Sequence, residues 1–297
     1  MPQPAPVPEA AAALATAPVL QSQRILLKDC ADPPAPDSVL PGLYVGSVGI
    51  VAGWGDVNMS ALALQIGAGV VLGKPITRAQ DGHPTLAPQS GSVAVVLGTD
   101  PPDEVRRQMA NLRAGLGPSE VARADSERGL YVYSTCGEDM RVACQSGNRM
   151  VPGPWRARLR ELATGHRLVV IDQLVFLHDG AIAEGASTWH VMQQLARVAV
   201  ASHCAILVLQ HLPRQPAASA DAWDAQPDVD AAARAATERM QYVLRGPTAA
   251  DVERLAIGRH ARHCWLCVAE SAATLDAEAA SQRLLSGGAR TGIDHGR

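Results

Sequence analysis

The sequence predicts an α/β fold with a mostly parallel β-sheet that is flanked by helices on both faces. Three continuous apolar runs, at residues 92–98, 167–172 and 204–209, have the composition of strands that are buried on both faces of such a sheet. Helix-forming stretches separate these runs, and strands that alternate with helices build parallel sheets.

The remaining elements follow from local signals. The first predicted helix, at residues 61–73, is apolar around nearly its whole circumference, so we expect it to be buried. Ser187 suits the N-cap of a late helix. Further strands are predicted at residues 38–52, 129–134 and 263–268, and helices at 61–73, 103–116, 154–164, 187–202, 229–244 and 248–257.

Composition divides the chain into three parts. Residues 1–36 are rich in Pro and Ala and predict a flexible tail. Residues 37–275 hold the predicted elements and form one domain, which includes a long surface loop at 212–228. Residues 276–297 are polar and glycine-rich, and we expect a second flexible tail there.

Charge and hydropathy argue against several classes of function. The net charge of −3 gives the protein no overall attraction to nucleic acid or to anionic membranes. The chain has no run of about 20 apolar residues that would cross a membrane. Its N-terminus lacks the basic start of a secretory signal. We therefore expect a cytoplasmic protein without a membrane partner.

The stretch that points to a function is the loop GWGDVNMS, which joins an apolar strand to an apolar helix. A phosphate-binding loop has the pattern GxxxxGK[S/T] in this setting, and its backbone N–H groups surround phosphate oxygens. Gly53 and Ser60 take the first and last positions of the pattern, whereas Asn58 and Met59 replace its second Gly and its Lys. The candidate nucleotide-binding residues are Gly53, Gly55, Asn58, Met59, Ser60 and Ala61.

Both replacements weaken the predicted site. Met59 cannot neutralise phosphate charge, and Lys28 and Lys74, the chain's two lysines, lie too far along the chain to replace a loop lysine. Asn58 would adopt a positive φ only with strain. We expect Mg-ATP to bind weakly or not at all. The alternative interpretation, an ordinary strand–turn–helix, remains open.

Two strand ends carry further candidates. Asp172 ends the run at 167–172 and, together with the Ser60 hydroxyl, could hold Mg²⁺. Gln210 and His211 end the next apolar run, where a polar group can sense a γ-phosphate. The simpler alternatives are a capping aspartate and a polar pair with a structural role.

The order of these pieces resembles the plasmid RepA helicases, a family of homohexameric replicative DNA helicases with a RecA-like core. The resemblance covers residues 37–270 and implies a RecA-like domain, single-stranded DNA as a partner, and a homo-oligomer or a mixed oligomer with a helicase-like relative. It rests on the DSVLPG stretch at 37–42, the loop at 53–60, Ala63-Leu64-Gln65, Asp100-Pro101-Pro102, the run at 167–172 and Gln210-His211.

The departures from that family fall in the active site. The resemblance places a catalytic Glu at Thr99, whose hydroxyl has no acid–base chemistry near pH 7. It places a His-His pair at Gln210-His211, and a lysine that reaches the neighbouring subunit's nucleotide at Ser271. The arginine finger has three candidate positions, near Val229, at Arg234 or at Arg239.

Other binding signals are weak. The spacing of Cys264 and Cys267 suits zinc, but residues three apart in a strand point to opposite faces, so we expect no zinc. The loop at 212–228 would face DNA, yet it offers one arginine, Arg214, against three aspartates. The basic helix of Arg156, Arg158 and Arg160 suggests a solvated face with ion pairs.

Together these patterns favour a RepA-helicase-like protein of a plasmid or mobile element. We expect its ATPase to be impaired and its role in DNA replication or maintenance to be structural or regulatory. Two alternatives remain open at this point. One is an active ATP-dependent hexameric DNA helicase, and the other is a binding module that keeps the fold and binds no nucleotide.

Overall fold

The chain divides into two units, Met1–Pro36 and Asp37–Arg297, and all the elements described below belong to the second. The structure is a computed structural model. It describes residues 27, 35, 37–40, 42–54, 58–74, 78–79, 90–147, 149–179, 185–212, 241–245, 264–269 and 284–286.

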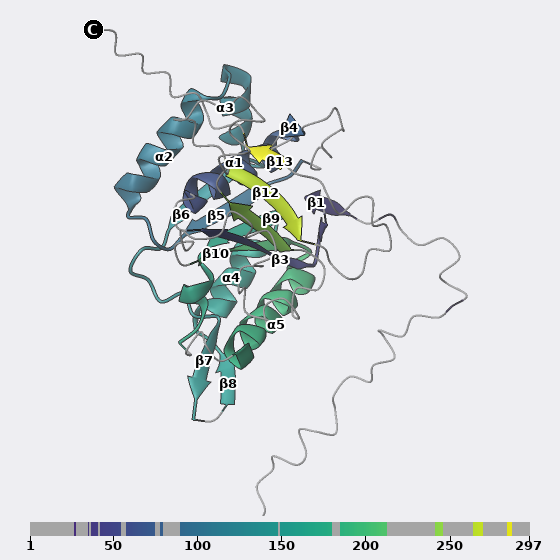
Figure 1. Ribbon diagram of the computed structural model, residues 1–297, viewed down its shortest axis with the longest axis vertical. Coiled ribbons are helices and arrows are strands. Elements are labelled where there is room, and N and C mark those ends of the chain that lie inside the picture. The colour runs from purple at the N-terminus through teal and green to yellow at the C-terminus, as the bar shows by residue number, and fades with distance from the viewer. Residues whose placement is uncertain are drawn as a thin grey trace, which may run out of the picture. The chain divides into compact units, whose positions relative to one another are not determined.

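A parallel β-sheet forms the centre of the second unit (Figure 1). Three strands, β4 (Arg78–Ala79), β13 (Leu284–Ser286) and β12 (Cys264–Ala269), extend one edge of this sheet through antiparallel pairs. The parallel strands are, in spatial order, β11 (Gln241–Arg245), β3 (Val48–Trp54), β10 (Ala205–Leu212), β9 (Leu168–Asp172), β5 (Val93–Leu97) and β6 (Leu130–Ser134).

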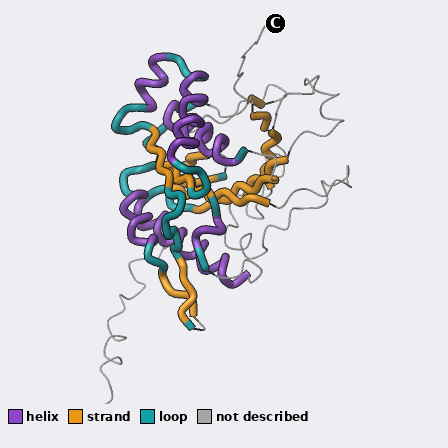
Figure 2. The backbone as a smooth tube through the Cα atoms, turned by 90° about the vertical axis from the view of Figure 1, so that its left-hand side faces the viewer, coloured by secondary structure: helices purple, strands orange, loops and turns teal. Residues whose placement is uncertain are grey.

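Helices cover both faces of the sheet (Figure 2). On one face, α1 (Met59–Leu72) and α2 (Pro102–Ala114) enclose one apolar core. On the other face, α4 (Trp155–Ala163) and α5 (Gly185–Ser202) enclose a second. Every residue of β5 and β9 is buried, as continuous apolar runs predict. The predicted α/β fold with helices on both faces is therefore confirmed.

The first helix, α1, is buried on most of its circumference, as its uniformly apolar sequence predicts. It ends at Gly73, which adopts the left-handed conformation with φ of 63°. The N–H groups of Gly73 and Lys74 then bind the carbonyls of Val70 and Gly69, which would otherwise lack partners. Within the described ranges, no helix combines the length and apolar character needed to cross a bilayer.

Several predicted elements differ from the structure. The helix predicted at 229–244 is wrong at its end, because Gln241–Arg245 form strand β11 between β3 and β12. Pairing on both sides favours a strand there, whatever the local helical preference. The frayed end predicted from residue 276 does not hold at β13, which pairs with β12. Helix α5 begins at Gly185, two residues before the predicted N-cap Ser187.

A short pair, β1 (Ser38–Leu40) with β2 (Leu43–Tyr44), precedes β3 within the strands predicted at residues 38–52. Other elements gave no clear sequence signal, among them helix α3 (Pro118–Ala124), which follows α2. Strands β7 (Ala143–Ser146) and β8 (Arg149–Pro152) form a hairpin beside α5. The predicted helix at 248–257 and the loop after Leu212 lie outside the described residues.

Candidate functional site

The candidate residues meet because four neighbouring strands are parallel and end at the same edge of the sheet. In the register of β10 with β3, His211 is the partner of Gly53. Asp172, the last residue of β9, is the partner of Leu209 on one side and of Leu97 on the other. The start of α1 and the residues that follow β5 therefore lie beside Asp172.

Asp172 is the centre of this site. Its carboxylate is completely buried and accepts hydrogen bonds from three side chains. Ser60 Oγ lies 2.9 Å from Oδ2, and Thr99 Oγ1 lies 3.2 Å from the same oxygen. His211 Nε2 lies 3.0 Å from Oδ1. His211 donates to this oxygen in the imidazole tautomer that carries its proton on Nε2.

These hydrogen bonds allow a polar group to be buried. A carboxyl group without partners would be costly in the interior, and the three neighbouring side chains offset that cost. The donors come from α1, from the residues after β5 and from β10. Through these hydrogen bonds, Asp172 connects α1, the residues after β5 and strand β10 to the end of β9. The peptide bond that follows it, Asp172–Gln173, is cis.

Asn58 has a different role from the one its position in the pattern suggests. Its φ is −74°, so this residue does not adopt the positive φ considered from the sequence. Its side-chain Oδ1 accepts a hydrogen bond of 3.0 Å from the N–H of Ala61, which makes Asn58 the N-cap of α1. Asn is among the preferred N-cap residues, so the residue type itself was the signal.

Met59 is buried, with 1% of its surface exposed, and belongs to the core between α1 and the sheet. Its thioether lies directly against Gly53. A Cβ added at Gly53 would clash with Sδ of Met59. In a phosphate-binding loop the backbone must stay open for close approach of phosphate. Here the Met59 side chain fills the space beside the loop's first glycine that a Cβ would occupy.

The other predicted residues are less informative. Gln210 is partly buried, and its Oε1 has no hydrogen-bond partner among the described residues. Gly55, Arg214 and Ser271 lie outside the described residues, as do all three candidate positions for an arginine finger, near Val229, at Arg234 and at Arg239.

The site fits a magnesium–nucleotide complex only in part. Ser60 and Asp172 are adjacent, as the two magnesium-side groups of such a site must be. The phosphate side fits poorly, because Met59 packs against Gly53 and supplies no positive charge. Among the described residues, this site included, no group of three or more His, Cys, Asp or Glu side chains is arranged to hold a metal ion.

A comparison with protein families identifies the domain. A sequence profile described as an AAA domain matches residues 17–217, more than half of the 297-residue chain. The chain belongs to the AAA domain family. This AAA domain is of the P-loop NTPase type with a RecA-like core, so the RecA-like core expected from the sequence is confirmed. The matched range includes Gly53, Ser60, Asp172 and His211.

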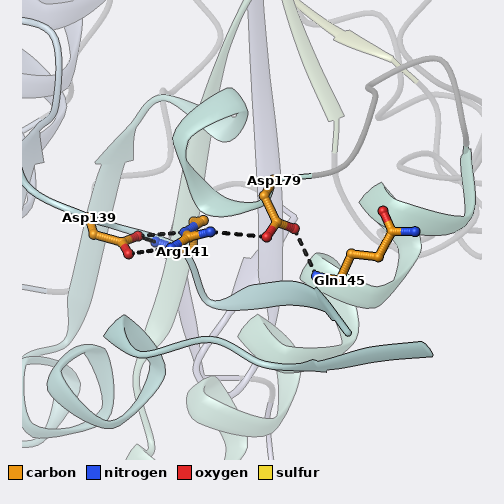
Figure 3. Close-up of polar contacts among 4 residues, drawn as sticks. All are labelled: Asp139, Arg141, Gln145 and Asp179. Atoms are coloured by element: carbon orange, nitrogen blue, oxygen red, sulfur yellow. Dashed lines mark hydrogen bonds and ion pairs between the residues drawn. The ribbon is translucent and has the colours of Figure 1, made fainter. Parts of the chain in front are cut away.

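The AAA domain also has a polar cluster that the sequence did not reveal (Figure 3). Arg141 donates hydrogen bonds to both carboxylate oxygens of Asp139 and one of 3.0 Å to Asp179. Hydrogen bonds from Arg141 lower the pKa of Asp139 to about 2. Asp179 Oδ1 also accepts a bond from the N–H of Gln145 in β7. The cluster connects the β7–β8 hairpin to the residues after β9, and it touches none of the site residues above.

Proposed function

We propose that this protein is a RepA-helicase-like member of the AAA domain family that does not hydrolyse ATP. It acts as a structural or regulatory component in the replication or maintenance of a plasmid or other mobile element. The observation that carries this proposal is the side chain of Met59, which lies against Gly53 where a phosphate would need open backbone.

The remaining groups support the same conclusion. Hydrolysis of a nucleoside triphosphate depends mainly on positive charge around the phosphates and on a group that orients the attacking water. The loop has Met59 where the RepA helicases have lysine. Thr99 stands at the position that the resemblance gives to the catalytic Glu of the RepA helicases. Its hydroxyl donates a hydrogen bond to Asp172 and carries no charge.

The domain has a well-formed core on each face of its sheet although the catalytic groups are absent from the positions the resemblance gives them, and this favours a role for the folded domain itself. The described residues form one apolar core on each face of the sheet, and Ser60, Thr99 and His211 all lie within hydrogen-bond distance of Asp172. We propose that the domain assembles as a homo-oligomer, or as a mixed oligomer with a helicase-like relative. Single-stranded DNA is the partner that the resemblance implies.

Nucleotide-dependent thermal stability tests the proposal directly. Ligand present at 100 times its dissociation constant stabilises a protein by about 2.7 kcal/mol, which corresponds to a rise of roughly 5–10 °C in the melting temperature of a domain of this size. We expect 1 mM Mg-ATP to change the melting temperature by less than about 1 °C, with or without single-stranded DNA. A rise of several degrees that disappears in Ser60→Ala would show that a working nucleotide site exists.

Light scattering tests the assembly. We expect a mass of several subunits at high protein concentration, or co-purification with a helicase-like partner from the same source. A strictly monomeric mass together with no such partner would contradict the proposed assembly, and it would leave the nucleotide result unaffected.

A further inference from the structure

Helix α4 carries three arginines, and they differ in their partners. Arg158 Nη1 lies 3.0 Å from Glu138 Oε2 and forms an ion pair. Arg156 and Arg160 lie four residues apart, so they share one face of the helix. Among the described residues, neither of these two forms an ion pair. Two like charges at this spacing repel each other, and an anion between them would remove that repulsion.

Arg156 and Arg160 line the same cavity, which has a volume of about 530 Å³ and lies between the end of β8, helix α4 and helix α5. This volume is within the range of small-molecule sites. Glu161 and Thr164 also line it, and Val198 contributes an apolar wall. The charged groups of the lining are thus two arginines and one glutamate, which leaves one net positive charge.

The Nε–H of Arg156 is the more specific sign of a ligand. This atom is buried and has no hydrogen-bond acceptor in the part of the chain that the structure describes. Buried donors of native proteins nearly always have an acceptor. Arg156 as a whole is partly exposed and lines the cavity, so a rotation of its guanidinium would bring this N–H to a ligand oxygen there.

We propose that this cavity binds a small oxyanion ligand, whose phosphate or carboxylate group sits between Arg156 and Arg160. The planar guanidinium fork of arginine matches the oxygen geometry of both groups and binds them through paired, charge-assisted hydrogen bonds. The cavity lies on the α4–α5 side of the sheet, whereas Met59 belongs to the core on the α1 side. The proposal is therefore independent of the candidate nucleotide site.

Isothermal titration calorimetry on the full chain tests the proposal. Pyrophosphate and citrate serve as probes at matched ionic strength, so that one arm reports phosphate and the other carboxylate recognition. We expect at least one probe to bind, with an affinity that falls at least ten-fold in Arg156→Gln and in Arg160→Gln. Arg158→Gln is the matched control on the same helix, and it should stay within two-fold of the unmodified protein.

Three results would overturn the proposal. The first is that neither probe binds, and the second is that Arg158→Gln weakens binding as much as the other two variants. The third is that a single-stranded oligonucleotide, titrated in parallel, binds more tightly than both probes and is lost in Arg156→Gln, because the site would then recognise a polynucleotide. If Arg156→Gln fails to fold, Arg156→Lys keeps the charge without the fork and should still lower the affinity several-fold.

Discussion

Ser60 donates a hydrogen bond of 2.9 Å to Asp172 although 112 residues separate the two in the sequence. Thr99 donates to the same carboxylate oxygen, and His211 lies 3.0 Å from the other. In an NTPase, Ser60 and Asp172 would hold magnesium. Here both belong to a network of hydrogen bonds around the buried carboxyl group of Asp172. This arrangement makes the site important for stability, whatever it binds.

We expect Asp172→Ala to destabilise the protein. The substitution leaves Ser60, Thr99 and His211 without their common acceptor. Ser60 is buried, and an unsatisfied buried polar group costs about 1–3 kcal/mol, whereas Thr99 and His211 are partly exposed and can bind water instead. Chemical denaturation should show a loss of at least 2 kcal/mol. Ser60→Ala, which keeps the other two donors on Asp172, is the matched control and should cost about 1 kcal/mol. An unchanged midpoint in Asp172→Ala would show that these hydrogen bonds contribute nothing.

The contact of Met59 with Gly53 predicts a coupled pair of substitutions. Gly53→Ala alone should be destabilising, because its Cβ clashes with the Met59 thioether. Met59→Ala alone should cost roughly 2–5 kcal/mol, as expected for a buried methionine. In the double variant the clash is gone, so the total should be smaller than the sum by about 0.5–3 kcal/mol. Strict additivity would mean that the two residues do not touch.

We expect no ATP hydrolysis above background, with or without single-stranded DNA. Met59 supplies no charge to the phosphates, and Thr99 cannot polarise the attacking water. Phosphate release by purified protein measures this directly, and a preparation of Asp172→Ala gives the contaminating background. DNA-stimulated turnover at ordinary helicase rates that Asp172→Ala abolishes would show an active helicase instead.

Repair of the loop should separate binding from hydrolysis. Asn58→Gly with Met59→Lys returns the loop glycine and its cation and uncovers Gly53, so the affinity for nucleotide should increase. Hydrolysis should stay near background until Thr99→Glu is added, and the three changes together should exceed the sum of their separate effects. Rapid hydrolysis from the two-residue repair alone would show that Thr99 does not occupy the catalytic position. Unchanged affinity would show that this loop is unrelated to a phosphate-binding loop.

The cysteines allow a measurement that depends on pH. Burial raises the pKa of Cys204 to about 12, whereas Cys136 is exposed. At pH 8, iodoacetamide should therefore modify Cys136 long before Cys204. The free energy of unfolding should fall as the pH rises from about 9 towards about 12, because the unfolded thiol then ionises while the folded thiol does not. Cys204→Ala should remove that part of the pH dependence, and equal labelling rates in the native protein would contradict the buried position.

The sequence predicted the sheet and the meeting of its strand ends well, because both follow from long-range rules. Continuous apolar runs indicate parallel strands, and the carboxyl ends of parallel strands share one edge. Ser60, Asp172 and His211 could thus be placed together in advance. The side-chain packing of Met59 could not, since a methionine after a loop fits a buried and an exposed position equally well. Strand β11 was missed because its partners lie far away in the sequence.

The place of β3 in the sheet has a consequence for the newly made chain. Its neighbours are β10 and β11, which begin more than 150 residues later than β3 does. Ribosomes add about 5–20 residues per second, so β3 waits roughly 10 to 30 s for its first partner. Throughout that time an apolar strand with two unpaired edges is present in the nascent chain. We therefore expect chaperones that shield this strand during synthesis to raise the yield of folded protein.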